Sequence, residues 1–191
     1  MAEPIRILAI AGSLRKASFN KGALRAAEQL CPAGAKIELC ELAGLPLFDQ
    51  DAESQPNAKV AEFKQKIRAA DAILIATPEY NYGLPGVLKN AIDVASRPYG
   101  DNSWSGKPVA ILSAAMSMGG GIRAQYQLRQ CFVFLNMEAL VQPEVAINNA
   151  HERFDEGGNL KDEKSKELIK QLLQNLVAKA RLMKPGLQKA A

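Results

Sequence analysis

Small and polar residues between positions 12 and 20 could together bind a phosphate group. They read Gly12-Ser13-Leu14-Arg15-Lys16-Ala17-Ser18-Phe19-Asn20. This segment follows an apolar run, 5–11, and precedes an alanine-rich stretch with helical spacing, 21–30. A loop between a strand and a helix start places backbone N–H groups and the helix N-terminus around an anion. With hydroxyl and amide donors and an arginine fork suited to phosphate, the segment is interpreted as a phosphate cradle.

Two missing motifs narrow the kind of phosphate that this loop could hold. The loop has no G-x-G-x-x-G, so the dinucleotide fingerprint is absent, and it lacks the G-x-x-x-x-G-K-[ST] of a P-loop. Hydroxyls with a single arginine, Arg15, and no Walker lysine suit a terminal monophosphate. The alternative is that Ser18 or Asn20 only caps the following helix.

A second loop carries aromatic side chains that could hold a flat ring. It reads Pro78-Glu79-Tyr80-Asn81-Tyr82-Gly83-Leu84-Pro85-Gly86. Tyr80 and Tyr82 can flank a planar heteroaromatic group, while backbone N–H groups between Glu79 and Gly83 can bond its edge. The alternative is a helix-entry turn whose tyrosines pack on the protein. Glu79 could act as a general base, but no partner is visible, so a structural or backbone role is favoured.

A third loop, 114–121, follows Ser113 and ends in three consecutive glycines, Gly119 to Gly121. Glycine allows the backbone to approach a ligand closely. Met116 and Met118 could line the site or fill gaps in the core. The alternative is a flexible turn between a strand and a helix.

The elements that must position these three loops alternate between strand and helix. Apolar runs or alternating patterns predict five strands, at 5–11, 37–42, 71–77, 109–113 and within 140–147, the last interrupted by Pro143. Helical spacing predicts helices at 21–30, 58–70, 87–96, 122–135 and 168–182. This alternation predicts one α/β domain over 1–191, a parallel sheet with helices on both faces in the flavodoxin-like order 2-1-3-4-5. In that order the three loops follow neighbouring strand ends and converge.

Composition excludes several other function classes. The single histidine, His151, nearly excludes a zinc site or a histidine-dependent triad, and the three scattered cysteines, Cys31, Cys40 and Cys131, indicate reduced thiols. The net charge is +4, but the basic residues are dispersed and aromatics are few, so small phosphorylated ligands fit better than nucleic acid. No run reaches the length of a membrane span, and the first residues lead at once into a strand. A cytoplasmic protein is expected.

These motifs resemble the NADPH-dependent FMN reductase family, and within it the bacterial chromate and quinone reductases. The similarity covers almost the whole chain and includes G-S-L-R, P-E-Y-N and Leu88-Lys89-Asn90-Ala91-Ile92-Asp93. It implies bound FMN. The residues implied to hold the FMN phosphate are Ser13, Arg15, Ser18, Phe19 and Asn20. Those implied to hold the isoalloxazine are Pro78, Glu79, Tyr80, Asn81, Tyr82 and Gly83, chiefly through backbone groups. Ser113, Gly119 and Gly120 would complete the contacts, although Ala114-Ala115 departs from the hydroxyl-rich start expected there.

The resemblance also implies an oxidoreductase in which the flavin carries the chemistry, without a catalytic acid, base or nucleophile. NADPH or NADH would reduce FMN and leave, and an acceptor would take its place in a ping-pong cycle. Quinones, chromate, azo compounds and free flavin are the implied acceptors. Arg15, Lys16 and Arg97 would attract anionic substrates to the mouth. The alternatives are a flavodoxin-type electron carrier, which the positive net charge disfavours, and a phosphate-binding protein without flavin.

Members of this family are homodimers or homotetramers with FMN at a subunit boundary. Candidate interface faces are the helices over 84–96 and 126–135. Arg123 and Tyr126 lie three residues apart on one helical face, and Glu144 is a candidate partner across subunits. The alternative is an ordinary surface cluster.

Overall fold

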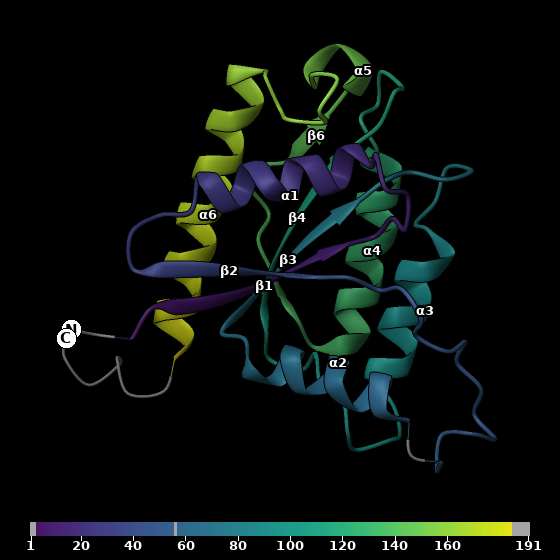
Figure 1. The fold of residues 1–191 in the computed structure, drawn as a ribbon. Helices are drawn as coiled ribbons and strands as arrows, with labels where there is room; N and C mark the ends of the chain where they lie inside the picture. Colours follow the sequence, from purple (N-terminus) through teal and green to yellow (C-terminus); the bar gives the residue numbers. More distant parts are fainter. Residues whose placement is uncertain (1–2, 56, 185–191) are drawn as a thin grey trace.

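The computed structural model describes residues 3–55 and 57–184 and shows a parallel sheet between two layers of helices (Figure 1). The strands are β1 (Ile5–Ala11), β2 (Ala35–Cys40), β3 (Ala72–Thr77), β4 (Pro108–Ala114), β5 (Glu138–Ala139) and β6 (Val145–Ile147). Their order is β2-β1-β3-β4-β5, with β6 also paired to β4, and every pair is parallel. The predicted flavodoxin-like strand order is confirmed.

The helices are α1 (Phe19–Gln29), α2 (Ala58–Ala69), α3 (Gly86–Ala95), α4 (Ile122–Leu135), α5 (Ala150–Arg153) and α6 (Glu163–Met183). All five predicted helices are present, and α5 is an additional single turn. The last helix begins at Glu163 rather than at Leu168, because Asp162 caps it: its carboxylate accepts a hydrogen bond from the Ser165 N–H at 2.9 Å. The hydrogen bond from the Ser165 hydroxyl lowers the pKa of Asp162, which keeps the cap ionised.

The fifth strand differs from the prediction of one strand within 140–147. Two short strands stand in its place, β5 and β6, and each pairs with a different part of β4. Between them the chain leaves the sheet near Pro143, whose nitrogen has no hydrogen to donate to a ladder. The sheet therefore has six strands rather than five.

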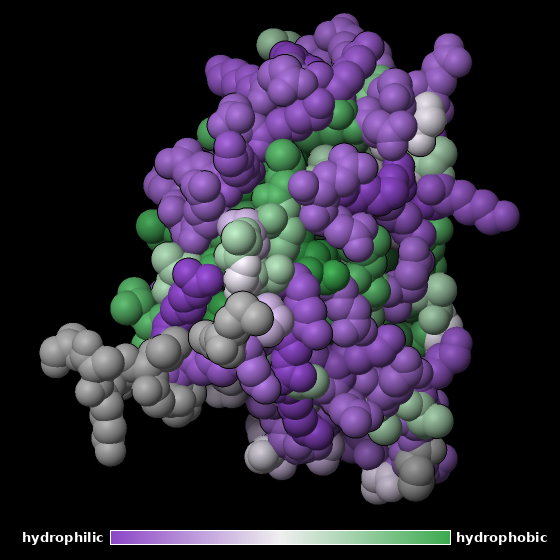
Figure 2. All heavy atoms as spheres, turned by 60° about the vertical axis from the view of Figure 1, so that its left-hand side comes forward, coloured by the Kyte–Doolittle hydropathy of each residue, from purple (hydrophilic) through white to green (hydrophobic). Residues whose placement is uncertain are grey.

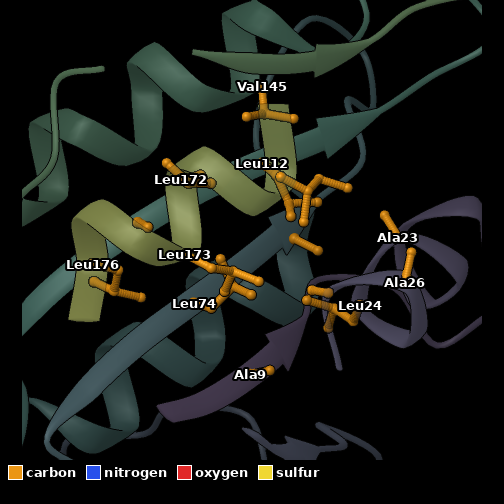
Figure 3. Close-up of a cluster of buried hydrophobic side chains, with 14 of the residues drawn as sticks. Ala9, Ala23, Leu24, Ala26, Leu74, Leu112, Val145, Leu172, Leu173 and Leu176 are labelled. Atoms are coloured by element: carbon orange, nitrogen blue, oxygen red, sulfur yellow. The ribbon is translucent and has the colours of Figure 1, made fainter. Parts of the chain in front are cut away.

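Alternate residues of the central strands point to opposite faces of the sheet, as the period of two requires. On one face, α1 and α6 cover residues such as Ala9, Leu74 and Leu112. Figure 3 shows Leu172, Leu173 and Leu176 of α6 beside Leu74, with Ala23, Leu24 and Ala26 of α1 to one side. On the other face, α2, α3 and α4 cover Leu8, Ile73 and Ile111. Burial on both faces explains the nearly continuous apolar runs of β1, β3 and β4.

Strand β2 lies at the edge of the sheet, as its alternating sequence predicted. The side of the molecule that carries α6 is mainly hydrophilic, with hydrophobic atoms visible only in patches between polar side chains (Figure 2). Among residues 3–55 and 57–184, no helix has the length and hydrophobicity required to span a bilayer.

The register of the sheet places the ends of β1, β3 and β4 next to one another. Ala11 pairs with Ala76, and Thr77 pairs with Ser113. The Gly12 N–H extends the ladder by donating to the Ala76 carbonyl at 2.8 Å. The loops that follow these three strands therefore leave the sheet side by side, toward the right in Figure 1.

Candidate functional site

The first loop, 12–18, presents backbone donors and cations to solvent at the N-terminus of α1. Leu14, Arg15, Lys16 and Ala17 are exposed. Within the described part of the chain, the N–H groups of Ser13, Leu14, Lys16 and Ala17 donate to no other residue. Ser18 caps α1 by accepting a hydrogen bond from the Lys21 N–H at 3.4 Å. Free amides, a helix N-terminus and two cations are the components of a phosphate site.

Three other predicted phosphate ligands of this loop are turned toward the protein. The Asn20 amide donates to the Ala114 carbonyl and accepts from the Ala114 N–H, both at 2.9 Å, and the residue is buried. Phe19 packs on Phe154 with ring centroids 5.2 Å apart. The Ser13 hydroxyl accepts from the Arg15 N–H at 3.3 Å. In the structure, therefore, Asn20 and Phe19 support the loop from beneath, and Ser13 shapes its backbone.

The second loop makes a tight hairpin turn that exposes both tyrosines. Tyr80 and Gly83 exchange two backbone hydrogen bonds, of 3.0 and 2.9 Å. Asn81 and Tyr82, between them, have φ of 50° and 63°, in the left-handed region. Asparagine tolerates this region, but for tyrosine it is strained, at a cost on the order of 1 kcal/mol. Strain of this kind is common where a turn presents side chains to a ligand.

Glu79 connects the second loop to helix α4. Its carboxylate accepts from the Arg123 N–H at 3.1 Å and from the Arg123 guanidinium at 2.9 Å, and its side chain is only 6% exposed. It thereby supplies the cap that Gly121, at the N-cap position of α4, has no side chain to provide. The same guanidinium lies 4.0 Å from the centre of the Tyr82 ring. The Glu79 side chain is thus bound within the protein, which leaves its backbone groups for the contact with a ring that the sequence predicts.

The remaining predicted residues of the second loop lie around this turn. Pro78 is buried, and the Thr77 hydroxyl donates to its carbonyl at 2.9 Å. Gly83 faces Gln127 of α4, whose side-chain oxygen accepts from the Leu84 N–H at 2.6 Å. A Cβ on residue 83 would lie 2.7 Å from that oxygen, so glycine lets α4 approach the turn.

The third loop exposes two methionines above a buried hydrogen-bond network. Met116 and Met118 are among the most exposed apolar side chains of the described residues. Ser113, by contrast, is fully buried, and its hydroxyl donates to the Gly120 carbonyl at 2.6 Å. Gly119 is partly exposed at the turn. The Ser113 side chain has no exposed surface, and it supports the third loop through this hydrogen bond.

Side-chain contacts between residues far apart in sequence join the three loops. Asn20 links the first loop to the end of β4, and the Ser13 hydroxyl lies 3.4 Å from the Tyr80 hydroxyl of the second loop. Glu79 and Arg123 link the second loop to the helix that follows the third. One rim thus combines free amides and cations with exposed aromatic and methionine side chains. It fits a flat ring that carries a phosphate, as FMN does.

Two residues of this arrangement were not predicted, Gln125 and Gln127 of α4. Gln125 shares the buried face of α4 with Leu128 and Phe132. A polar residue at a core position of an amphipathic pattern was the available signal. Gln127 is exposed and follows Arg123 by one turn, and nothing in the sequence indicated its contact with the second loop.

A cavity of about 400 Å³ lies apart from this rim, between α2, the end of α3 and residues 46–55 and 57. Arg97 lines it and makes two hydrogen bonds of 2.9 Å to Glu53. This arginine lies beyond the far end of α3, a helix about 15 Å long that starts at the second loop. Arg97 therefore contacts this cavity and not the three loops, and its attraction of anionic substrates stays a prediction. Lys64 and Arg68, which also line the cavity, both pair with Asp101, and the hydrogen bond from Lys64 lowers the pKa of that carboxyl.

No three histidine, cysteine or acidic side chains in the described part of the chain are grouped so that they could hold a metal ion.

The comparisons with known proteins agree with the geometry of the rim. The family model described as NADPH-dependent FMN reductase matches residues 5–152. The chain is 52% identical over 178 residues to an NAD(P)H-dependent FMN reductase of Pseudomonas aeruginosa, covering 92% of this chain and 95% of that protein. It is 46% identical over 181 residues to the NADPH:quinone oxidoreductase of Arabidopsis thaliana, covering 91% of both chains.

A solved structure is also similar over nearly its whole length. The flavoenzyme NAD(P)H:(acceptor) oxidoreductase FerB from Paracoccus denitrificans superposes with a TM-score of 0.86 at 31% identity. The match covers 94% of this chain and 98% of that one.

Proposed function

The chain belongs to the NADPH-dependent FMN reductase family, and from this premise we propose that it is an FMN-dependent NAD(P)H oxidoreductase that reduces quinones. The observation that carries the proposal is the rim formed by the three loops. Its phosphate-binding half and its aromatic half lie at the ends of neighbouring strands.

When bound, FMN would supply the redox chemistry, which is hydride and electron transfer between NAD(P)H and the acceptor. The chain's own residues bind and orient. The amides of the first loop and Arg15 hold the phosphate, and the turn at Asn81–Tyr82 presents backbone and ring surface to the flavin edge. Glu79, fixed by Arg123, keeps that turn in place.

The exposed side chains of the rim indicate how acceptors are received. Tyr80, Tyr82, Met116 and Met118 offer a flat, apolar and adaptable surface on which a quinone or nicotinamide ring can stack. Such a surface is permissive, so we extend the proposal to chromate, azo compounds and free flavin. Arg15 and Lys16, both exposed, attract the anionic ones.

One assay tests the function directly. Purified protein is titrated with FMN, and NADPH oxidation is then followed with and without a quinone. We expect saturable FMN binding and quinone-dependent NADPH oxidation. FMN binding without NADPH oxidation would favour the electron carrier, and the absence of any FMN binding would contradict both functions.

Replacing Arg15 with alanine should weaken FMN binding about tenfold or more, since a charge-assisted hydrogen bond to phosphate contributes about 1.5–3 kcal/mol. Riboflavin lacks the phosphate, so its affinity should not change. Fluorescence titrations with both ligands check this, with Lys170→Ala, at an exposed position of α6, as the control that should change neither affinity. Equal losses for FMN and riboflavin would show that Arg15 does not contact the phosphate.

We also propose self-association through α4. Tyr126, Val133 and Phe134 are exposed on this helix, and an apolar face of this kind is typical of an interface. Arg123 is half exposed and forms an ion pair with Glu79. Glu144 directly precedes β6 and is partly exposed. Arg123 and Glu144 remain candidate contacts across subunits of a homodimer or homotetramer.

Tyr126→Glu is the cleaner probe of this interface, because substituting Arg123 would also release Glu79. The added charge should lower the mass measured by light scattering, from a dimer to a monomer or from a tetramer to a smaller assembly. Leu39→Glu, at an exposed apolar position of β2, is the control and should leave the mass unchanged. An unchanged mass for Tyr126→Glu would contradict an interface at this helix.

A cytoplasmic location is the last part of the proposal. Cys31, Cys40 and Cys131 are all free thiols. Burial raises the pKa of each, which keeps them protonated and slow to oxidise. Unpaired cysteines are usual in a reducing compartment.

A further inference from the structure

Gln125 is a fully buried polar residue in the first turn of α4, beneath the third loop. Its side-chain nitrogen donates to the Ser113 hydroxyl at 2.8 Å and to the Val145 carbonyl at 2.9 Å. A carbonyl can only accept, so the amide nitrogen must be the atom that faces Val145. The orientation of the Gln125 amide is thereby fixed.

This orientation also fixes the Ser113 hydroxyl. The hydroxyl oxygen accepts from Gln125, so its single hydrogen is directed elsewhere, and the Gly120 carbonyl lies 2.6 Å away. Gln125 therefore acts on the third loop through Ser113. It also acts on β6, which it bonds directly at Val145.

The glycine turn, 119–121, packs closely against Ser113 and β6, the two parts of the structure to which Gln125 donates hydrogen bonds. Gly120 and Gly121 have φ of 59° and 91°, in the left-handed region. A Cβ on Gly121 would lie 2.9 Å from the Ser113 Cβ, and one on Gly120 would lie 2.9 Å from the Ala146 carbonyl. A shift of Ser113 or of β6 would consequently displace the turn.

Packing alone does not explain a glutamine at this position. Its side-chain oxygen is buried without a hydrogen-bond partner among the described residues. Such a group costs about 1–3 kcal/mol, whereas methionine would fill a similar volume without that cost. This cost in stability is explained if the hydrogen bonds of Gln125 are needed for the function of the site.

We propose that Gln125 is a positioning residue for the cofactor: through Ser113 it holds the turn 119–121 in the conformation that receives FMN. The inference rests on the proposed function, because it concerns the same FMN site. Gln125 itself is buried beneath the rim, so it would act through Ser113 and not by contacting FMN.

A double-mutant cycle on the FMN dissociation constant tests the proposal. Gln125→Met removes the donor at similar volume, Ser113→Ala removes the relay, and a third protein carries both changes. We expect each single variant to bind FMN about tenfold more weakly and the double variant no more weakly than either one, since both changes break one connection. Gln125→Leu, which also lacks a donor, should behave like Gln125→Met.

Thermal unfolding of each apoprotein separates binding from folding. The proposal is overturned if Gln125→Met binds FMN as the wild type does, or if the two single effects multiply to about a hundredfold in the double variant. If Gln125→Leu fails to fold, the cycle with methionine and alanine still decides. Wild-type protein that binds no FMN would instead refute the proposed function, so the two failures can be told apart.

Discussion

Replacing Gly22 with alanine is expected to lower the free energy of unfolding by about 3 kcal/mol. Gly22 lies inside α1, where alanine would otherwise favour the helix by about 1 kcal/mol. A Cβ at this position would, however, lie 2.3 Å from the Gly158 carbonyl oxygen and 3.0 Å from the Phe154 ring. Backbone cannot rotate away as a side chain can, so the steric clash outweighs the gain in propensity. Urea denaturation measures the loss.

Gly86→Ala is the matched control for this substitution. Gly86 is the first residue of α3, and a Cβ there would meet no atom within 4 Å. Stability should stay the same or rise by up to about 1 kcal/mol. If Gly22→Ala proved as stable as Gly86→Ala, the close contact between α1 and the segment 154–158 would be incorrect.

Replacing Glu79 with alanine should impair both stability and FMN binding. The variant loses the cap of α4, leaves the Arg123 guanidinium without its carboxylate and frees the turn that carries Tyr82. Removing charge-assisted hydrogen bonds of this kind should lower the free energy of unfolding by about 2–3 kcal/mol. FMN affinity should fall at least about tenfold, because the second loop would then have to become ordered when FMN binds, and this ordering costs free energy.

Two further variants separate the contributions of Glu79. Glu79→Gln keeps an acceptor for the Arg123 N–H but removes the ion pair, so its effects should be intermediate. Glu167→Ala removes an exposed carboxylate from α6 and should change neither quantity by a measurable amount. Wild-type FMN affinity in Glu79→Ala would contradict the role assigned to the Glu79–Arg123 pair.

The sequence predicted the parts of this fold that depend on local patterns. The apolar runs of β1, β3 and β4, the helical spacing and the three unusual loops were sufficient for the strand order and for the convergence of the three loops at one edge of the sheet. The fifth strand was predicted as one element, because its apolar residues continue across Pro143 and a pattern does not show which of them pair. The additional turn α5 is too short to have a periodicity.

The roles of individual site residues depended on contacts that no local pattern contains. Asn20 and Ala114 are 94 positions apart, and Glu79 and Arg123 are 44 apart. The family resemblance implied that Asn20 and Ser113 contact the cofactor, and the sequence alone does not show to which side such polar side chains point. The structure turns both inward to support the loops. The burial of these side chains and the identity of their hydrogen-bond partners are determined by tertiary packing.

The split of the fifth strand has a consequence for aggregation. A long, apolar edge strand offers unpaired amides on which another chain can add, and proteins avoid this with short, charged or interrupted edges. At one edge of this sheet β2 carries Lys36 and Glu38, and at the other β5 and β6 have only 2 and 3 residues, with Pro143 between them. Neither edge is a template for strand addition. Copies of this chain should therefore meet through helices, and the protein should stay dispersed at concentrations where open sheets form fibrils.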